Sequence, residues 1–217
     1  GILEHDFGVS QYKVHWYMER TEELSHGGST GFTPPAGISF QRIPPDKSMA
    51  SMLVNNELDA AAINSPWQNM PTFIGRSHRI PGSDGDWNKV QLLFSDRMAE
   101  GARFFKKWGF LPVNHAYTIR GDIYKKYPWV AFNLYTGFVK AKEHFNAKLV
   151  DSIPSALFFG REYLAMTQGL FGNDPYPYGV KANRKMLETL IDFSHEQGLT
   201  SKKMKVEELF AASTLDL

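Results

Sequence analysis

Apolar and polar residues alternate in several short stretches of the chain, a pattern typical of β-strands with one buried face. The first stretch, residues 14–18, runs directly into the polar residues Glu19 and Arg20. The last stretch, residues 113–119, is apolar and aromatic and contains His115, so we expect it to be a buried central strand. Together, the alternating stretches predict strands at residues 14–18, 38–43, 58–63, 90–94 and 113–119.

Other segments repeat their apolar residues with the spacing of a helix. Several of them end at a glycine, which is the residue preferred at a helix C-terminus, and Ser48 stands where a helix N-cap is expected. The predicted helices cover residues 1–7, 48–56, 96–108, 128–145, 156–170, 180–197 and 206–212. A strand, a helix and a strand follow each other between residues 38 and 63, which favours a parallel unit and an α/β fold.

Composition excludes several classes of protein. The 217 residues carry a net charge of +1, which does not favour nucleic acid as a partner. No apolar run approaches the about 20 residues that a membrane span needs, so we expect no membrane partner. Cysteine is absent, which excludes disulfides and thiolate chemistry and fits either the cytosol or the periplasm. The chain opens with Gly1 rather than Met and has no export signal at its start, and we expect residues upstream of it.

The best candidate site follows the first predicted strand. Open α/β sheets bind ligands at the carboxyl ends of their strands, which is where Glu19 and Arg20 stand. Glycine lets backbone N–H groups approach an anion closely, and hydroxyl groups add further donors. The next loop supplies both, and an imidazole, through Ser25, His26, Gly27, Gly28, Ser29 and Thr30. The alternative is an ordinary surface loop, for which such a composition is also typical.

Histidine offers a further candidate but no metal site. His115 is either a general acid or base, because imidazole titrates near neutrality, or a core residue bonded to a carbonyl group. The seven histidines show no HxxxH or HxH spacing, and phosphate-binding and dinucleotide-binding glycine patterns are absent as well. We therefore expect no organic cofactor and no metal. The alternative is a metal ion bound by His and Glu side chains that are distant in the sequence and converge in space.

Several motifs together resemble one enzyme family. They are HWYMER at residues 15–20, SHGGSTGF at 25–32, PVNH at 112–115, YPWV at 127–130, DPYPYG at 174–179 and SHEQGL at 194–199. In this combination, which extends over nearly the whole chain, the sequence resembles the 4,5-dihydroxyphthalate decarboxylases.

The resemblance implies a fold similar to that of the type II periplasmic solute-binding proteins, with two α/β lobes, mixed sheets flanked by helices and a ligand cleft between the lobes. It also implies that this chain lacks the N-terminal part of the family fold, so that its first lobe is incomplete. Residues 1–112 are then expected to form mostly the second lobe. Residues 113–217 would contribute a crossover strand and helices that return to the first lobe, without a separate linker.

The activity that the resemblance implies is the decarboxylation of 4,5-dihydroxyphthalate to protocatechuate, in the cytoplasm, by a homo-oligomer that binds a small aromatic carboxylate. We expect Arg20, Ser25, Thr30 and the backbone of Gly27 and Gly28 to bind the carboxylate that is retained. His115 or His26 is the expected proton donor, with Glu19 as the orienting residue or the base for the phenol. The competing hypothesis is a solute receptor that binds an aromatic carboxylate for a transporter, since the same fold serves both functions.

Overall fold

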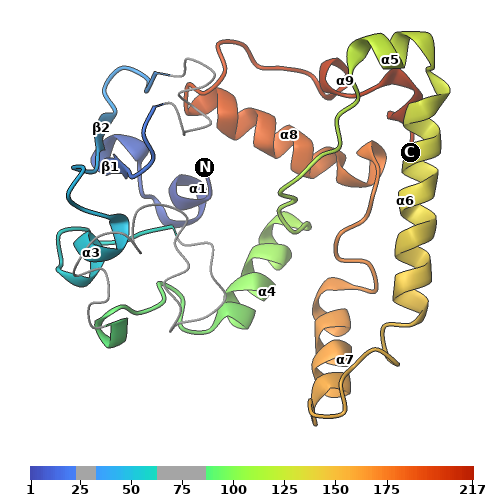
Figure 1. The fold of residues 1–217 in the computed structure, drawn as a ribbon, viewed down its shortest axis with the longest axis horizontal. Coiled ribbons are helices and arrows are strands. Elements are labelled where there is room, and N and C mark those ends of the chain that lie inside the picture. Colours follow the sequence, from blue (N-terminus) through green and yellow to red (C-terminus); the bar gives the residue numbers. More distant parts are fainter. Residues whose placement is uncertain (23–32, 63–86) are drawn as a thin grey trace. The chain divides into compact units, whose positions relative to one another are not determined.

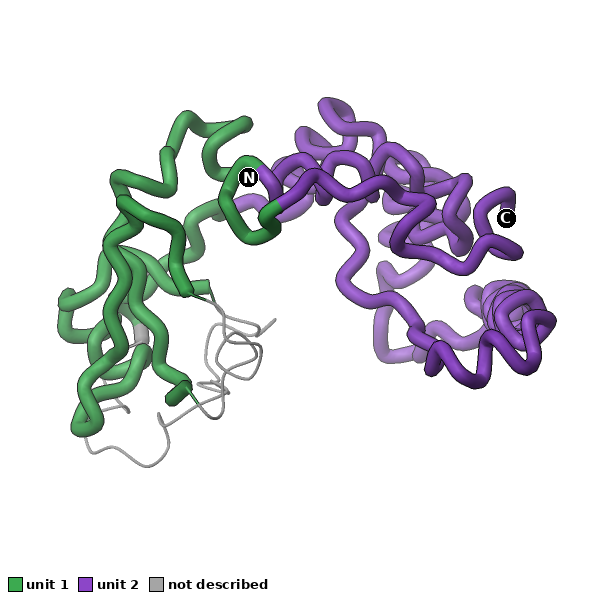
Figure 2. The backbone as a smooth tube through the Cα atoms, turned by 90° about the horizontal axis from the view of Figure 1, so that it is seen from above, with its two compact units in different colours: residues 1–95, 196–201 green, residues 96–195, 202–217 purple. Residues whose placement is uncertain are grey.

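The computed structural model describes residues 1–22, 33–62 and 87–217 and has an α/β architecture in which helices predominate (Figure 1). Two compact units make up the chain (Figure 2). The first comprises Gly1–Ser95 with Glu196–Ser201, and the second comprises Asp96–His195 with Lys202–Leu217. None of the helices in these described ranges is long and apolar enough to cross a membrane.

The first unit contains the sheet. Strands β1 (His15–Met18) and β2 (Ser39–Arg42) pair in parallel, with His15 opposite Ser39 and Met18 opposite Arg42. At one end of the pair, His15 Nδ1 lies 2.8 Å from the hydroxyl of Ser39. Beyond the other end, the N–H of Ile43 donates to the carbonyl of Met18 at 2.9 Å. The two strands therefore end at the same edge, which the next section describes.

Two short helices flank these strands in the sequence, and local signals define their ends. Helix α1 (Ile2–Phe7) ends at Gly8, which has a φ of 68° and donates its N–H to the carbonyl of Glu4. Helix α3 (Met49–Val54) begins with a capping box, in which Ser48 and Ser51 each accept the backbone N–H of the other. Buried side chains of α3 contribute to the interior of the unit, and they are Ala50, Ser51, Met52 and Val54.

The second unit is helical where it is described. Its helices are α4 (Arg97–Trp108), α5 (Gly121–Lys126), α6 (Trp129–Ala147), α7 (Gly160–Phe171), α8 (Val180–Glu196) and α9 (Val206–Leu209). Val180, Ile191 and Val206 form a buried cluster between α8 and α9. Aromatic contacts join α4 to its neighbours: the ring of Phe105 meets Phe171 of α7 edge-on at 5.4 Å, and Trp108 meets Phe193 of α8 at 5.7 Å.

The predicted helices are confirmed, with small changes at their ends. Helix α4 begins after the N-cap Asp96 and ends at Gly109, as the sequence indicates. The expected helix at residues 156–170 begins only at Gly160, because the N–H of Leu157 bonds to the carbonyl of Pro154 in a turn that precedes it. Helix α5 is not among the predicted helices.

Of the five predicted strands, the first two are confirmed as β1 and β2. The predictions at 90–94 and 113–119 are wrong, and so is the described part, 58–62, of the third. Residues 113–118 are exposed, and the ring of Tyr117 stacks on Phe138 of α6 at 4.2 Å. The aromatic alternation there reflects stacking on a helix rather than pairing in a sheet.

The α/β class is thus confirmed, whereas the two-lobed fold of the solute-binding proteins stays a prediction. The described residues form a single parallel pair of strands, which is too small a sheet to identify that fold. The expected lobe boundaries at residues 112 and 113 also stay a prediction.

Candidate functional site

The candidate site lies at the edge where β1 and β2 both end. Glu19 and Arg20 follow the last residue of β1, and Arg42 is the last residue of β2. In parallel sheets this edge is the usual place for ligands, because side chains from successive strands converge there.

Glu19 is fixed at this edge by the start of α3. Its side chain is buried, with 7% of the residue exposed, and its Oε2 accepts the N–H of Met49 at 2.7 Å. Met49 is the first residue of α3, and N–H groups in the first turn of a helix lack partners within the helix. The carboxylate therefore satisfies one of these donors and also balances the partial positive charge of the helix start.

Arg20 and Arg42 stand at the same edge, one just after β1 and the other at the end of β2. Nη1 of Arg42 donates to the carbonyl of Arg20 at 2.5 Å and lies 3.6 Å from the sulfur of Met18. Arg20 is half-buried and Arg42 is exposed. The sequence reasoning did not single out Arg42 as a candidate, although a signal was present: it lies one residue before the end of the second predicted strand, 38–43.

His115 belongs to the second compact unit, whereas Glu19 and Arg20 belong to the first. It is exposed, and its Nε2 lies 3.5 Å from the side-chain amide of Asn114. The expectation that His115 sits in a buried strand is wrong, because residues 113–119 form no strand. Its role as a proton donor stays a prediction.

The remaining predicted site residues lie outside the described residues. They are Ser25, His26, Gly27, Gly28 and Thr30. Within the ranges that are described, no three His, Asp or Glu side chains stand together as potential metal ligands. The expectation of a metal-free and cofactor-free site stays a prediction.

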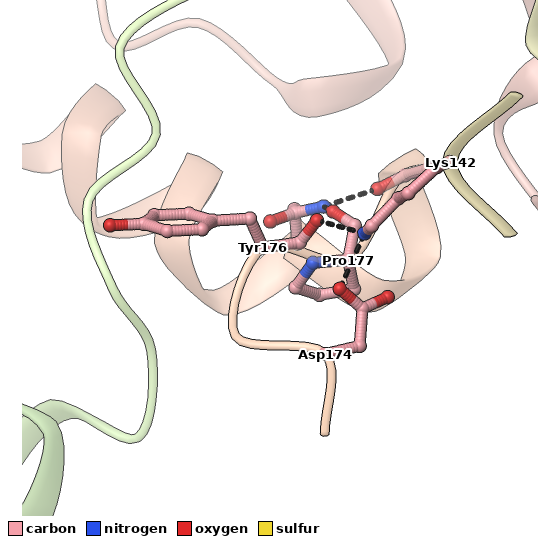
Figure 3. Close-up of polar contacts among 6 residues, drawn as sticks. Lys142, Asp174, Tyr176 and Pro177 are labelled. Atoms are coloured by element: carbon pink, nitrogen blue, oxygen red, sulfur yellow. Dashed lines mark hydrogen bonds and ion pairs between the residues drawn. The ribbon is translucent and has the colours of Figure 1, made fainter. Parts of the chain in front are cut away.

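The aromatic loop at residues 174–179 is held from two sides (Figure 3). The ammonium group of Lys142, on α6, donates to the carboxylate of Asp174 and to the carbonyl of Tyr176, and lies 4.5 Å from the centre of the Tyr178 ring. From α8, the amide of Asn183 donates to the carbonyls of Pro177 at 2.7 Å and Gly179 at 2.8 Å. Because these bonds fix the backbone, the loop is a rigid part of the second unit.

A pocket of about 300 Å³ lies between α8 and the segment that leads into α9. Opposite charges pair along its walls: Arg184 lies 2.8 Å from Glu207, and Lys203 lies 2.6 Å from Asp192. The Lys203 ammonium group is thus the partner of Asp192 Oδ1, which is otherwise without a hydrogen bond. These pairs neutralise the pocket internally and leave it no net charge with which to select an ionic ligand.

Two carboxyl groups in and next to this segment have lowered pKa values. A hydrogen bond from its own backbone N–H, and then the guanidinium of Arg184, lower the pKa of Glu207 below its usual value. For Glu208, the ammonium group of Lys202 and then the N–H of Lys205 lower the pKa. Both groups are exposed, so these shifts describe stabilisation of α9 rather than tuning of a catalytic acid.

Comparison with known proteins gives one informative similarity. No family model matches the chain. The chain is 23% identical over 217 residues to a protein from Comamonas testosteroni named 4,5-dihydroxyphthalate decarboxylase. The alignment covers 99% of this chain but 62% of the relative, so the chain spans about three fifths of that protein's length. The similarity is distant, and it supports a decarboxylase only at the level of a broad family.

Proposed function

We propose that the chain is part of a carboxy-lyase that removes CO2 from a dihydroxylated aromatic dicarboxylate, with 4,5-dihydroxyphthalate as its substrate and protocatechuate as its product. The observation that carries the proposal is the similarity along 99% of the chain to a protein with that name. Its cytoplasmic location is part of the same proposal. The strand edge with Arg20 and Arg42 supports it, because guanidinium groups bind carboxylates well.

The chemistry explains what such a site must supply. Direct loss of CO2 from a benzene ring leaves a carbanion in the ring plane, where the ring cannot delocalise it. A hydroxyl group para to the departing carboxylate avoids this, because its electrons move into the ring when it loses its proton to a base. The carbon that carries the carboxylate then accepts a proton and becomes tetrahedral. When CO2 leaves, the electrons of the broken C–C bond restore the aromatic ring and the phenol regains its proton.

The residues fit these tasks in the following proposed roles. Arg20, with Arg42 beside it, binds the carboxylate that remains on the ring, together with Ser25, Thr30 and the backbone of Gly27 and Gly28. His115 or His26 protonates the ring carbon. Glu19 was a candidate for the orienting residue or the phenol base, and its buried hydrogen bond to Met49 favours the orienting role.

The test is a direct assay of CO2 release from 4,5-dihydroxyphthalate, with the relative from Comamonas testosteroni as the positive control. The 217-residue chain is assayed alone and as a fusion to the part of the relative that it does not match. The chain and the fusion are also assayed after treatment with a chelator, which tests the expectation of a metal-free site. Substrate binding is measured separately by calorimetry.

CO2 release by the chain or the fusion, at a rate that depends on Arg20, is the expected result. Tight binding without CO2 release would instead favour the alternative of a solute receptor for an aromatic carboxylate. If the fusion is folded but neither binds the substrate nor releases CO2, while the positive control is active, both hypotheses are overturned.

A further inference from the structure

The backbone of Arg20 lies beyond the last pair of the sheet. Met18 is the last residue of β1, and its carbonyl accepts the N–H of Ile43 at 2.9 Å. Arg20 follows in a bend outside the strand. Within residues 1–22, 33–62 and 87–217, no backbone N–H donates to the Arg20 carbonyl. The position of this peptide group therefore depends on a side chain.

That side chain is Arg42, the register partner of Met18 on β2. Its Nη1 donates to the Arg20 carbonyl at 2.5 Å, so the guanidinium reaches past its own partner to the second residue after it. A hydrogen bond from a charged donor is shorter and stronger than one between neutral groups. Because the carbonyl of Arg20 and the N–H of Thr21 belong to one planar peptide group, this bond holds both.

The guanidinium of Arg42 is itself supported from both strands. On β1, the sulfur of Met18 lies 3.6 Å from Nη1 and is a weak acceptor. On β2, the ring centre of Phe40 lies 6.0 Å from the guanidinium carbon, since residues two apart in a strand share a face. These contacts give an exposed side chain a defined direction toward Arg20.

Glu19 fixes the chain on the other side of Arg20. Its carboxylate accepts the N–H of Met49 at 2.7 Å, and the residue is buried. Arg20 thus follows an anchored side chain and has an anchored carbonyl of its own. An arginine whose backbone is fixed on both sides loses less freedom when its side chain binds an anion, which favours binding.

We propose that Arg42 is a positioning residue: by holding the carbonyl of Arg20, it orients the Arg20 side chain toward the carboxylate of the ligand. The inference rests on the proposed function, in which Arg20 binds a carboxylate, and it defines what Arg42 contributes beside it. The alternative is that Arg42 contacts the carboxylate directly, since a guanidinium group has further N–H donors.

The first test measures the backbone without any ligand, so it does not depend on the proposed function. Nitrogen-15 relaxation gives the order parameter of the Thr21 amide in the 217-residue chain. We expect a value near about 0.85, typical of rigid backbone, and a fall toward about 0.6 in Arg42→Met, which has no donor. Arg42→Lys retains a donor and is expected to restore much of the difference.

Lys13→Met is the matched control, because Lys13 is an exposed cation of the same unit. It is expected to leave the order parameter of the Thr21 amide unchanged. An equally rigid Thr21 amide in Arg42→Met would overturn the proposal.

The second test separates positioning from direct contact with a double-mutant cycle. Calorimetry measures the binding of 4,5-dihydroxyphthalate to the chain or the fusion. Arg42→Met alone is expected to weaken binding by up to about 10²-fold, which a displacement of about 1 Å can cost. In a protein that already carries Arg20→Ala, which keeps the backbone carbonyl, Arg42→Met is expected to have no further effect, because no guanidinium remains to be positioned.

The outcomes distinguish this inference from the proposed function. Equal losses of affinity with and without the Arg20 side chain would overturn the positioning role and make Arg42 a direct ligand contact. If the wild type binds 4,5-dihydroxyphthalate and releases CO2, and Arg42→Met binds as tightly, the positioning role fails and the decarboxylase stands. If the wild type neither binds nor releases CO2, the proposed function fails, and the Thr21 amide still decides whether Arg42 holds Arg20.

Discussion

The carboxylate of Glu19 accepts the backbone N–H of Met49 at 2.7 Å, so the residue that follows β1 stabilises the start of α3. The bond joins positions 30 residues apart and is partly buried. It fixes the backbone at the strand edge where Arg20 and Arg42 also lie. The orientation of the candidate site therefore depends on a contact between a strand end and a helix start.

Replacing Glu19 with alanine is expected to destabilise the protein by about 1–3 kcal/mol, because the N–H of Met49 loses an ionised acceptor in a partly buried position. Urea denaturation measures the loss. Asp59→Asn removes a carboxylate from an exposed position of the same unit and serves as the control. If both variants were equally stable, the contact with Met49 would contribute nothing measurable.

Lys142→Met is expected to lower the free energy of unfolding by about 1–2 kcal/mol, since Asp174 and the carbonyl of Tyr176 lose a shared donor. The side chain of Lys142 is 18% exposed, whereas that of Asp174 is 48% exposed and is partly hydrated after the change. Thermal unfolding followed by circular dichroism measures the difference. Lys140→Met, at an exposed position of the same helix, is expected to change stability little.

Gly179→Ala is expected to cost about 1–3 kcal/mol or more, for two reasons. Gly179 has a φ of 103°, which disfavours a side chain, and a Cβ there would lie 2.5 Å from the backbone oxygen of Leu217. Gly137→Ala is a control for which the opposite effect is expected. Gly137 is an exposed residue in the middle of α6, and a Cβ there meets nothing within 4 Å. That variant is expected to stabilise the helix by about 0.5–1 kcal/mol. Equal effects of the two changes on urea denaturation would contradict this explanation.

The sequence predicts the helices well because their end signals are local. Gly8 and Gly109 both adopt the left-handed conformation that ends a helix, and Ser48 forms the capping box expected of an N-cap. Each signal acts within one helical turn, so neighbouring residues suffice to identify it.

Strand pairing and the contacts of the candidate site join residues that are far apart in the sequence, and the sequence predicts them less well. The apolar run at residues 113–119 has the composition of a strand, but Tyr117 stacks on Phe138 and the run pairs with no strand in the described chain. Glu19 and Arg20 were identified from their place after a strand. Their contacts with Met49 and Arg42 depend on how α3 and β2 are placed, which no local pattern specifies.

Stability at acidic pH is expected to depend on Glu207 and Glu208. Their pKa values in the folded protein lie below the usual 4.5, so below that pH the unfolded chain binds more protons than the folded protein. Stability therefore rises with pH in this range: the contribution is complete above pH 4.5 and is lost as the pH falls through the lowered pKa values. Urea denaturation from about pH 2.5 to 6 is expected to show a shallower dependence in the Glu207→Gln, Glu208→Gln double variant. If the double variant showed the same dependence of stability on pH as the wild type, the two carboxylates would bind protons equally in the folded and unfolded states.

The proposed proton donor gives the most direct test of the mechanism. If His115 protonates the ring carbon, His115→Ala in the active protein is expected to lower kcat for CO2 release by at least about 10²-fold, since general acid catalysis contributes that much. His144→Ala is the matched control, because His144 is also exposed in the second unit and has no proposed role. A kcat close to that of the wild type would remove His115 from the mechanism. His26 would then be the remaining candidate for the acid, and its replacement should produce the loss that His115→Ala does not.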